Sequence, residues 1–271
     1  DTDVLEVTID GITYVEADPQ LSLNPGTGTW TLNLNGTTPL VDATYDVSVV
    51  AYDEVGNTSA DTTTDELVVD TTLPPAPTVD TLVTNDSEPT VTGTYDPSDF
   101  SALEVTVDGT TYVDTDPELT LDAVAGTWAL DLTGSPLVDG TYDVGAVQTD
   151  ASGANAIPDD TNGELVIDTV APDAPTVNSQ VTSDTTPVIT GTYDPSDTPI
   201  GFSVTVDGVT YTAPDPALTL SPGTGTWSLN LETAGQTVAE GIYDVTASQF
   251  DDAGNSTDDA TTGELEVDVT A

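Results

Sequence analysis

The sequence contains no lysine, arginine, histidine, cysteine or methionine. Without histidine and cysteine, the chain has no imidazole base, no thiolate nucleophile, no disulfide and no zinc site of the usual kind. Without lysine, it has neither a P-loop nor a residue that forms Schiff bases. Ion pairs between side chains are excluded too, because every charged side chain is acidic. These absences predict that the chain is not an enzyme.

Charge of one sign dominates the composition. The 271 residues include 49 aspartates and glutamates, and the net charge is −49. Such a chain repels nucleic acids and anionic membrane surfaces. Carboxylate and carbonyl oxygens are the ligands of Ca²⁺, which takes about six to eight of them. The alternative is that the carboxylates are hydrated and keep the chain soluble, and we expect this for most of them, with a few loop acids binding metal.

Hydrophobic residues make up 36% of the sequence and are spread periodically, which favours several small cores over one large core. We see no apolar run long enough to span a membrane, no lipidation motif and no signal peptide. We expect the sequence to be a piece of a longer chain that carries targeting signals elsewhere. The expected partners are neighbouring repeats of the same chain, and the piece itself is expected to be monomeric.

The sequence repeats itself with a period the size of a domain. A tryptophan preceded by Gly-Thr recurs at intervals of 98 and 99 residues, at Trp30, Trp128 and Trp227. Two further motifs keep this period: the Asp-Gly pairs that begin at Asp10, Asp108 and Asp207, and the Tyr-Asp-Val triplets that begin at Tyr45, Tyr142 and Tyr243. A period this long indicates tandem domains and not a solenoid.

Within one period the pattern is that of an all-β domain. In the middle copy Leu103, Val105 and Val107 alternate with polar residues, which predicts a strand with one buried face. Asp108-Gly109 fits a tight hairpin turn, because both residues tolerate positive φ. We find no helical periodicity. The pattern predicts about seven or eight short antiparallel strands per copy, hence tandem Ig-like β-sandwich domains in an extended rod.

Two aromatic positions have structural interpretations. One tryptophan per copy at a fixed strand position predicts a core anchor. Tyr142, in the sequence Gly140-Thr141-Tyr142, resembles a tyrosine corner, in which the hydroxyl bonds to nearby backbone.

The predicted domains are residues 1–70, 71–168 and 169–271. Alignment of Gly11 with Gly109 places Asp1 near Asp99, so we expect the first copy to lack its first two strands. The junctions at Asp70–Pro75 and Asp168–Pro172 are short and rich in proline, which predicts stiff linkers.

These junctions and one loop resemble those of a known family. The run from Asp168 to Pro175 is similar to the D-x-T-A-P-x-A-P junction of bacterial Ig-like repeats, and Asp251–Ser256 to their D-x-A-G-N-x-S loop. Asp53–Asn57 matches this loop as well, and Asp150–Asn155 matches it with one inserted residue. Such repeats form the extender regions of giant RTX adhesins and biofilm-associated surface proteins. The resemblance covers the whole chain.

The resemblance implies a structural role. It implies a spacer that holds distal ligand-binding domains away from the cell, for adhesion and biofilm formation, with Ca²⁺ at the domain junctions stiffening the rod. It also implies an extracellular location at the cell surface, with anchoring through other regions of the protein.

Chain direction in an Ig sandwich predicts where calcium would bind. The last strand of one copy delivers its terminal aspartate to the loops at the N-terminal end of the next copy. Three carboxylates at such a junction repel one another by roughly 3–4 kcal/mol per pair at ~4–5 Å, and a divalent ion reverses this cost. The predicted ligands are Asp70, Asp96, Asp99 and Asp150 at the first junction, Asp168, Asp173, Asp194, Asp197 and Asp251 at the second, and the equivalent loop residue Asp53. The Asp-Gly and Asp-Pro pairs are assigned to turns.

Two other functions remain as alternatives. The copies could bind a carbohydrate or a protein through aromatic residues near the loops, namely Tyr52, Tyr95, Tyr193 and Phe250, although these are better placed to cover the junctions. A glycosidase with paired carboxylates is the third and least favoured hypothesis, because no copy contains a unique acid pair.

Overall fold

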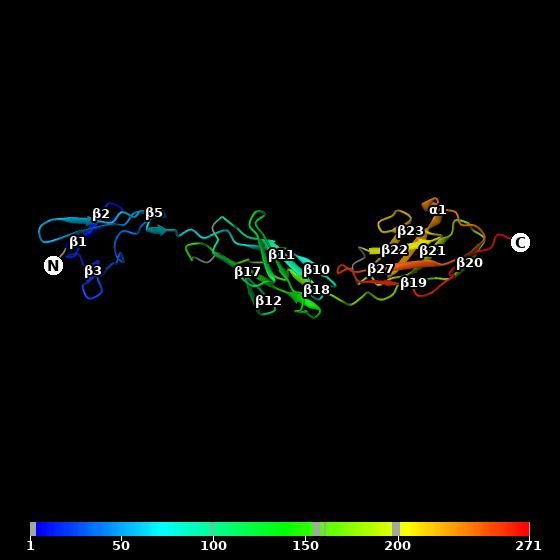
Figure 1. Ribbon diagram of the computed structural model, residues 1–271. Helices are drawn as coiled ribbons and strands as arrows, with labels where there is room; N and C mark the ends of the chain where they lie inside the picture. The colour runs from blue at the N-terminus through cyan, green and yellow to red at the C-terminus, as the bar shows by residue number, and fades with distance from the viewer. Residues whose placement is uncertain (1–3, 99, 154–157, 160, 197–200, 271) are drawn as a thin grey trace.

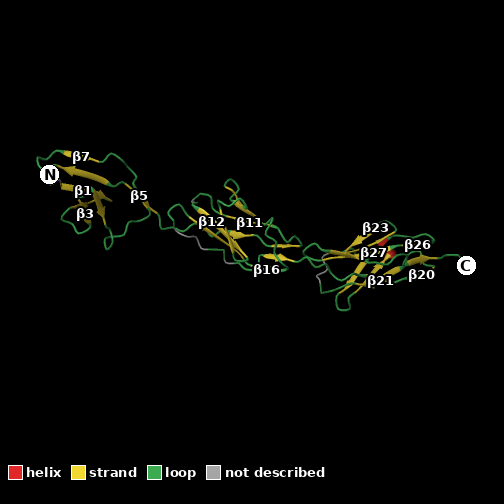
Figure 2. Cartoon of the chain, turned by 60° about the horizontal axis from the view of Figure 1, so that its bottom comes forward, coloured by secondary structure: helices red, strands yellow, loops and turns green. Residues whose placement is uncertain are grey.

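The computed structural model describes residues 4–98, 100–153, 158–159, 161–196 and 201–270. The chain forms three β-sandwich bodies that follow one another end to end from the N-terminus to the C-terminus (Figure 1). Figure 2 shows the same succession from another side, with strands and loops making up almost all of the described chain. The protein is therefore an all-β chain of tandem Ig-like sandwiches. We call the bodies the first, second and third repeat, for residues 1–70, 71–168 and 169–271.

The second repeat shows the complete arrangement. Its sheets have the strand orders β14-β15-β11-β9, β13-β12-β17 and β10-β18-β16, and only the β10–β18 pair is parallel. Alternate residues of these strands point inward, as Val91, Leu103, Leu130 and Ile167 do, and form one core. The strands are β9 Thr78–Val79, β10 Leu82–Thr84, β11 Thr90–Thr94, β12 Ala102–Val107, β13 Thr110–Val113, β14 Leu119–Asp122, β15 Thr127–Asp131, β16 Gly140–Tyr142, β17 Val144–Thr149 and β18 Leu165–Ile167.

The third repeat has the same arrangement with one more strand, β28, among the described residues: its sheets are β19-β21-β25-β24, β20-β29-β26 and β23-β22-β27-β28. Its elements are β19 Thr176–Val177, β20 Gln180–Thr182, β21 Val188–Thr192, β22 Gly201–Val206, β23 Val209–Thr212, β24 Leu218–Ser221, β25 Thr226–Asn230, α1 Leu231–Ala234, β26 Gly241–Tyr243, β27 Val245–Phe250, β28 Ser256–Asp258 and β29 Leu265–Val267.

The single-turn helix α1 was not expected from the sequence. The Asn230 side chain caps its start by accepting a hydrogen bond from Thr233 N, and Gly235 ends it in the left-handed conformation. One helical turn is too short to give a 3.6-residue pattern, which is why periodicity did not indicate it.

The turn and corner predictions are confirmed. Asp108 and Gly109 have φ values of 48° and 74°, as a two-residue type I′ hairpin requires. The Tyr142 hydroxyl donates to Val138 O at 2.8 Å, and the Tyr243 hydroxyl donates to Ala239 O at 3.0 Å. These bonds are tyrosine corners.

The tryptophan prediction is confirmed in two repeats and wrong in one. Trp128 and Trp227 are 1% and 2% exposed, but Trp30 is 39% exposed. The first repeat consists of β1 Val4–Ile9, β2 Ile12–Val15, β3 Leu21–Asn24, β4 Thr29–Leu32, β5 Ala43–Tyr45, β6 Ser48–Tyr52, β7 Thr58–Ala60 and β8 Leu67–Val69. In its described part, β4 pairs only with β3 and β8 only with β5, so no counterpart of β11 covers Trp30.

Candidate functional site

The second junction is organised by the loop from Asp251 to Asn255, which follows β27. Asp251 N donates to Asn255 O at 3.1 Å, and the Asp251 Oδ1 atom accepts from Asn255 N at 2.8 Å. Gly254 has a φ of 93°, a left-handed conformation that glycine adopts without strain. The loop therefore closes on itself, with the Asp251 carboxylate at its centre.

The amide of Asn255 ties this loop to the end of the second repeat. Its Nδ2 atom lies 2.7 Å from Asp168 O, 2.7 Å from Asp251 Oδ2 and 3.4 Å from Val170 O. One carboxylate oxygen and two backbone carbonyl oxygens thus converge on a single side-chain amide. The amide has two N–H donors, so it serves the two nearer oxygens well and the third only weakly.

Two further hydrogen bonds strengthen the junction. Asn85 N, in the second repeat, donates to Ala253 O at 3.0 Å, and the Thr257 hydroxyl donates to Pro172 O at 2.8 Å. Ala253 is buried, with 9% of its surface exposed. The corresponding residue in the Asp53–Asn57 loop of the first repeat, Val55, is 83% exposed. The loop of the third repeat is therefore packed against its neighbour.

The other predicted ligands of this junction are placed differently. The Asp168 carboxylate accepts from Val170 N at 3.0 Å within its own linker, so its backbone carbonyl is the group that contacts Asn255. Asp173 is exposed in the linker. Asp194 accepts from the Ser196 hydroxyl and Ser196 N, and these hydrogen bonds lower the pKa of its carboxyl. Asp197 lies outside the described residues.

Gln249 fixes the position of Asp194 beside the loop. Its Oε1 atom accepts from Asp194 N at 3.0 Å, and its Nε2 atom donates to Asp194 O at 2.7 Å. Gln249 is fully buried on β27, two residues before Asp251. The prediction that these two loops share one end of the repeat is confirmed. Gln148 makes the same pair of bonds to Asp96 in the second repeat, at 2.9 and 2.7 Å.

At the first junction, the carboxylates of the predicted ligands accept hydrogen bonds from residues two positions further along the chain. Asp70 accepts from Thr72 N at 3.0 Å and from the Thr72 hydroxyl at 2.6 Å. Asp96 accepts in the same way from Ser98. Asp150 is fully buried and accepts from the Ser152 hydroxyl at 2.8 Å. Asp99 lies outside the described residues.

Asp53 shows the same loop in the first repeat. Its carboxylate accepts from Asn57 Nδ2 at 2.7 Å and from Asn57 N at 2.8 Å, as Asp251 does from Asn255. Hydrogen bonds from the side chain and backbone of Asn57 lower the pKa of the Asp53 carboxyl.

Within the described residues, no three acidic side chains come close enough to hold a metal ion. What the second junction brings together is a mixed oxygen set, with one carboxylate from Asp251 and the carbonyls of Asp168 and Val170. Carboxylate and carbonyl oxygens are the donors that suit Ca²⁺. The donors are of the type that calcium prefers, but the N–H groups of Asn255 Nδ2 occupy the point where they meet, so an ion there would require the Asn255 amide to turn.

Two buried glutamates were missed by the sequence analysis. Glu164 and Glu264 are each 2% exposed, and their Oε2 atoms accept from Val144 N and Val245 N, both at 3.0 Å. Each glutamate, just before the last strand of its repeat, is thereby tied to the first residue of the strand after the tyrosine corner, β17 in the second repeat and β27 in the third. The repeated pattern Asp-x-Thr-x-x-Glu-Leu, at Asp61, Asp159 and Asp259, was the available signal.

Glu264 should make stability depend on pH. Burial raises the pKa of its carboxyl, but hydrogen bonds from Val245 N and Thr261 outweigh burial, so the pKa lies below its usual value. A lowered folded-state pKa contributes stability above the unfolded pKa, near 4.5, and this contribution is lost as the pH falls through the folded value. We expect Glu264→Gln to cost about 1 kcal/mol at pH 7, and less as the pH is lowered below about 4.

Urea unfolding of both chains between pH 7 and pH 3 measures this difference. Glu266→Gln is the control, because it removes the same charge from the outward face of β29. A stability difference for Glu264→Gln that stays constant over this range contradicts the prediction.

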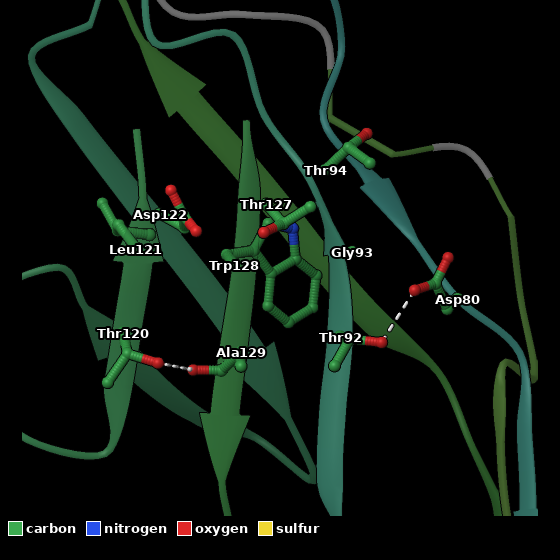
Figure 3. A pocket seen from close by; sticks show the side chains of 10 residues that line it. All are labelled: Asp80, Thr92, Gly93, Thr94, Thr120, Leu121, Asp122, Thr127, Trp128 and Ala129. Carbon is green, nitrogen blue, oxygen red and sulfur yellow. Dashed lines mark hydrogen bonds between the residues drawn. The ribbon is translucent and has the colours of Figure 1, made fainter. Parts of the chain in front are cut away.

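Two of the four aromatic residues considered for carbohydrate or protein binding, Tyr95 and Tyr193, are buried. Tyr95 and Tyr193 are 7% and 5% exposed and pack against Phe100 and Phe202, so neither offers a stacking face. A pocket of about 380 Å³ lies on the β14-β15-β11-β9 sheet of the second repeat (Figure 3). Trp128 lines it but is 1% exposed, which leaves mainly threonine and aspartate side chains available there.

No helix in the described parts of the chain is both long and apolar enough to cross a membrane. No family model matches this sequence, and no curated protein matches it.

Several solved structures of tandem domains resemble the chain in fold. The fibronectin(III)-like modules of Clostridium thermocellum CbhA are 15% identical, with a TM-score of 0.41, over 70% of this chain and 93% of theirs. A crystal structure of consecutive titin domains is 11% identical, with a TM-score of 0.44, over 97% of this chain and 89% of its own. Bacteroides ovatus SGBP-B, solved with a mixed-linkage heptasaccharide, is 16% identical, with a TM-score of 0.25, over 99% of this chain and 60% of its own. These likenesses concern the fold alone.

Proposed function

We propose that the chain is a spacer segment of a large extracellular bacterial adhesin. In this role the tandem repeats keep distal ligand-binding domains at a distance from the cell surface. The observation that carries the proposal is the second junction, where a loop of the third repeat is hydrogen-bonded to the end of the second repeat and to their linker. A spacer transmits length only if its junctions resist bending, and these hydrogen bonds would oppose bending at the second junction.

We further propose that Ca²⁺ stiffens the rod at this junction. The Asp251 carboxylate and the carbonyls of Asp168 and Val170 would hold the ion after the Asn255 amide flips, which turns its Oδ1 atom, in place of Nδ2, toward the ion. Bound calcium would supply positive charge that a chain with a net charge of −49 otherwise lacks. Water would complete the coordination, because Ca²⁺ needs about six or more oxygens.

Calcium is expected to raise the melting temperature of the chain and to increase its maximum dimension in solution. Binding to the folded state alone adds about 2.7 kcal/mol of stability at a free Ca²⁺ concentration ~100 times Kd. Calorimetry measures the melting temperature, and small-angle X-ray scattering measures the maximum dimension, each in Ca²⁺, in Mg²⁺ and in chelator. Mg²⁺ should act more weakly, because it prefers a smaller octahedral shell that keeps its own water.

Two variants localise the effect. Asp251→Asn should abolish most of the calcium response, because it removes the only carboxylate of the mixed set. Asp252→Asn removes the same charge from the adjacent exposed position and should leave the response intact. If neither melting temperature nor maximum dimension responds to calcium in the unmodified chain, the calcium proposal is wrong.

A further inference from the structure

The outer face of the β14-β15-β11-β9 sheet in the second repeat is hollowed around Ala129. This residue, on β15, pairs with Thr92 on one side and with Thr120 on the other. Its side chain is a single methyl group between two longer neighbours, so the surface is lowest there (Figure 3). The hollow has a volume of about 380 Å³, within the usual range of small-molecule sites.

Two carboxylates lie at opposite sides of this hollow. The Asp80 Oδ2 atom, just after β9, accepts a hydrogen bond from the Thr92 hydroxyl at 2.7 Å. Asp122, at the end of β14, accepts at its Oδ1 atom from Val124 N at 2.9 Å and from Ala125 N at 3.0 Å. In the part of the chain that the structure describes, the second oxygen of each carboxylate accepts no hydrogen bond. Each side of the hollow therefore offers a strong acceptor to a ligand.

Thr127 adds a hydroxyl group beside Asp122. The two residues are paired across β15 and β14, with Cβ atoms about 5 Å apart. In the third repeat the equivalent hydroxyl, on Thr226, is bonded to the Thr224 hydroxyl at 2.7 Å. The second repeat has Ala125 at the position of Thr224, so its Thr127 hydroxyl keeps its hydrogen-bonding capacity for a ligand.

The two carboxylates are too far apart to hold one metal ion. Asp122 is on β14 and Asp80 follows β9, and these are the two outer strands of the sheet. Neighbouring strands are ~4.8 Å apart, so three spacings separate the carboxylates by about 14 Å. Calcium needs its oxygens within ~2.6 Å. A ligand that bonds to both sides must be extended and must carry donors at two separate places.

The chemistry of the hollow favours a neutral, hydroxyl-rich ligand. A net charge of −49 repels acidic sugars and phosphates. Sugar hydroxyls can donate to the carboxylates and can also exchange hydrogen bonds with threonine hydroxyls. The methyl group of Ala129 and the backbone at Gly93 offer a small apolar surface to the C–H face of a sugar ring.

We propose that this hollow binds a short stretch of neutral oligosaccharide that crosses the four strands of the sheet. Ring hydroxyls at its two ends donate to Asp80 and Asp122, and the Thr127 hydroxyl bonds to the sugar beside Asp122. This activity goes beyond a spacer role, because it gives the chain a contact with saccharides along its side.

The third repeat is a natural comparison, because the same sheet face there lacks both carboxylates. Asn178 takes the place of Asp80, and Ser221 takes the place of Asp122. The Asn178 Nδ2 atom donates to the Thr190 hydroxyl at 3.0 Å. We therefore expect the saccharide to bind to the second repeat and not to the third.

A glycan array probed with the full chain in chelator tests the proposal. Neutral oligosaccharides should bind, and acidic ones should not. The best-binding neutral glycan is then titrated into isotope-labelled chain and followed by nuclear magnetic resonance. Amide signals of residues 120–122 and 127–129 should shift, and those of the equivalent residues 219–221 and 226–228 should stay in place.

Variants that copy the third repeat test the two carboxylates. Asp122→Ser and Asp80→Asn should each weaken binding about fivefold or more, because each removes a charged acceptor. Both replacements are the residues that the third repeat carries on the same strands, so they suit the fold. Ala129→Phe should abolish binding by filling the hollow. Ser228→Phe makes the same change in the third repeat and is the matched control, which should leave binding intact.

Salt distinguishes a neutral saccharide from a cationic ligand. Saccharide binding should change little between about 0.05 M and about 0.5 M NaCl, whereas a polyamine attracted by the carboxylates would be released. Spermine is the probe for this alternative. The proposal is overturned if no neutral glycan binds, if Asp122→Ser and Asp80→Asn bind as the parent does, or if only spermine shifts these amides. Because chelator is present throughout, none of these outcomes bears on the calcium proposal.

Discussion

Replacing Gly191 by alanine is expected to destabilise the third repeat by about 3 kcal/mol or more. The added Cβ would lie 1.8 Å from Thr176 O and 2.6 Å from the Nε1 atom of Trp227. Neither the Thr176 carbonyl nor the Trp227 ring can move freely, because Trp227 Nε1 donates to this carbonyl at 3.0 Å and the ring is buried. Relief of the clash must therefore move β19 or break the hydrogen bond.

Thermal unfolding followed by calorimetry measures this effect, with an expected loss of roughly 15 °C for the transition of the third repeat. Gly145→Ala in the second repeat is the matched control, because nothing lies within 4 Å of its added Cβ. The control should change stability by less than about 0.5 kcal/mol. Equal shifts for the two variants would show that the close approach at Gly191 is not what makes glycine necessary.

Truncation of the tryptophan is expected to have unequal effects in the first and third repeats. Trp227→Ala should cost about 3–5 kcal/mol, because it leaves a cavity in the core and removes the hydrogen bond to Thr176 O. Trp30→Ala should cost about 1 kcal/mol, because the side chain is 39% exposed. The difference comes from the covering strand β21, whose counterpart the described part of the first repeat does not contain.

Urea unfolding of each variant, with far-ultraviolet circular dichroism as the readout, measures both costs. Trp227→Phe is a useful companion, because it keeps most of the apolar volume and loses only the indole N–H. It should fall between the parent chain and Trp227→Ala. A cost for Trp30→Ala as large as that for Trp227→Ala would contradict the structural difference between the repeats.

Several local features followed from the sequence alone because each depends on neighbouring residues. The Asp108-Gly109 pair specifies a type I′ turn, since both residues accept positive φ. The Tyr142 corner needs only a carbonyl four residues earlier. Alternation along Leu103, Val105 and Val107 indicates which face is buried, and all three are at most 2% exposed.

The junction was only partly predictable. Chain direction correctly placed Asp168 near the Asp251 loop, but it could not show that the Asp168 carbonyl, rather than its carboxylate, makes the contact. Sequence reasoning selected carboxylates because they carry charge. The principal residue at the junction is instead Asn255, an uncharged residue whose amide joins two segments 85 residues or more apart in the chain.

By itself, the sequence determined the all-β class, the domain-sized repeat, the hairpin turns and the exclusion of imidazole, thiol and amine chemistry. These depend on residue type and on spacing within a few positions. Only the tertiary structure decided which tryptophan is covered, which glutamates are buried and which oxygens meet at the second junction. Those outcomes depend on strands and loops that are distant in sequence. The same Gly-Thr-Trp motif gives a buried tryptophan where a distant strand pairs beside it and an exposed one where none does.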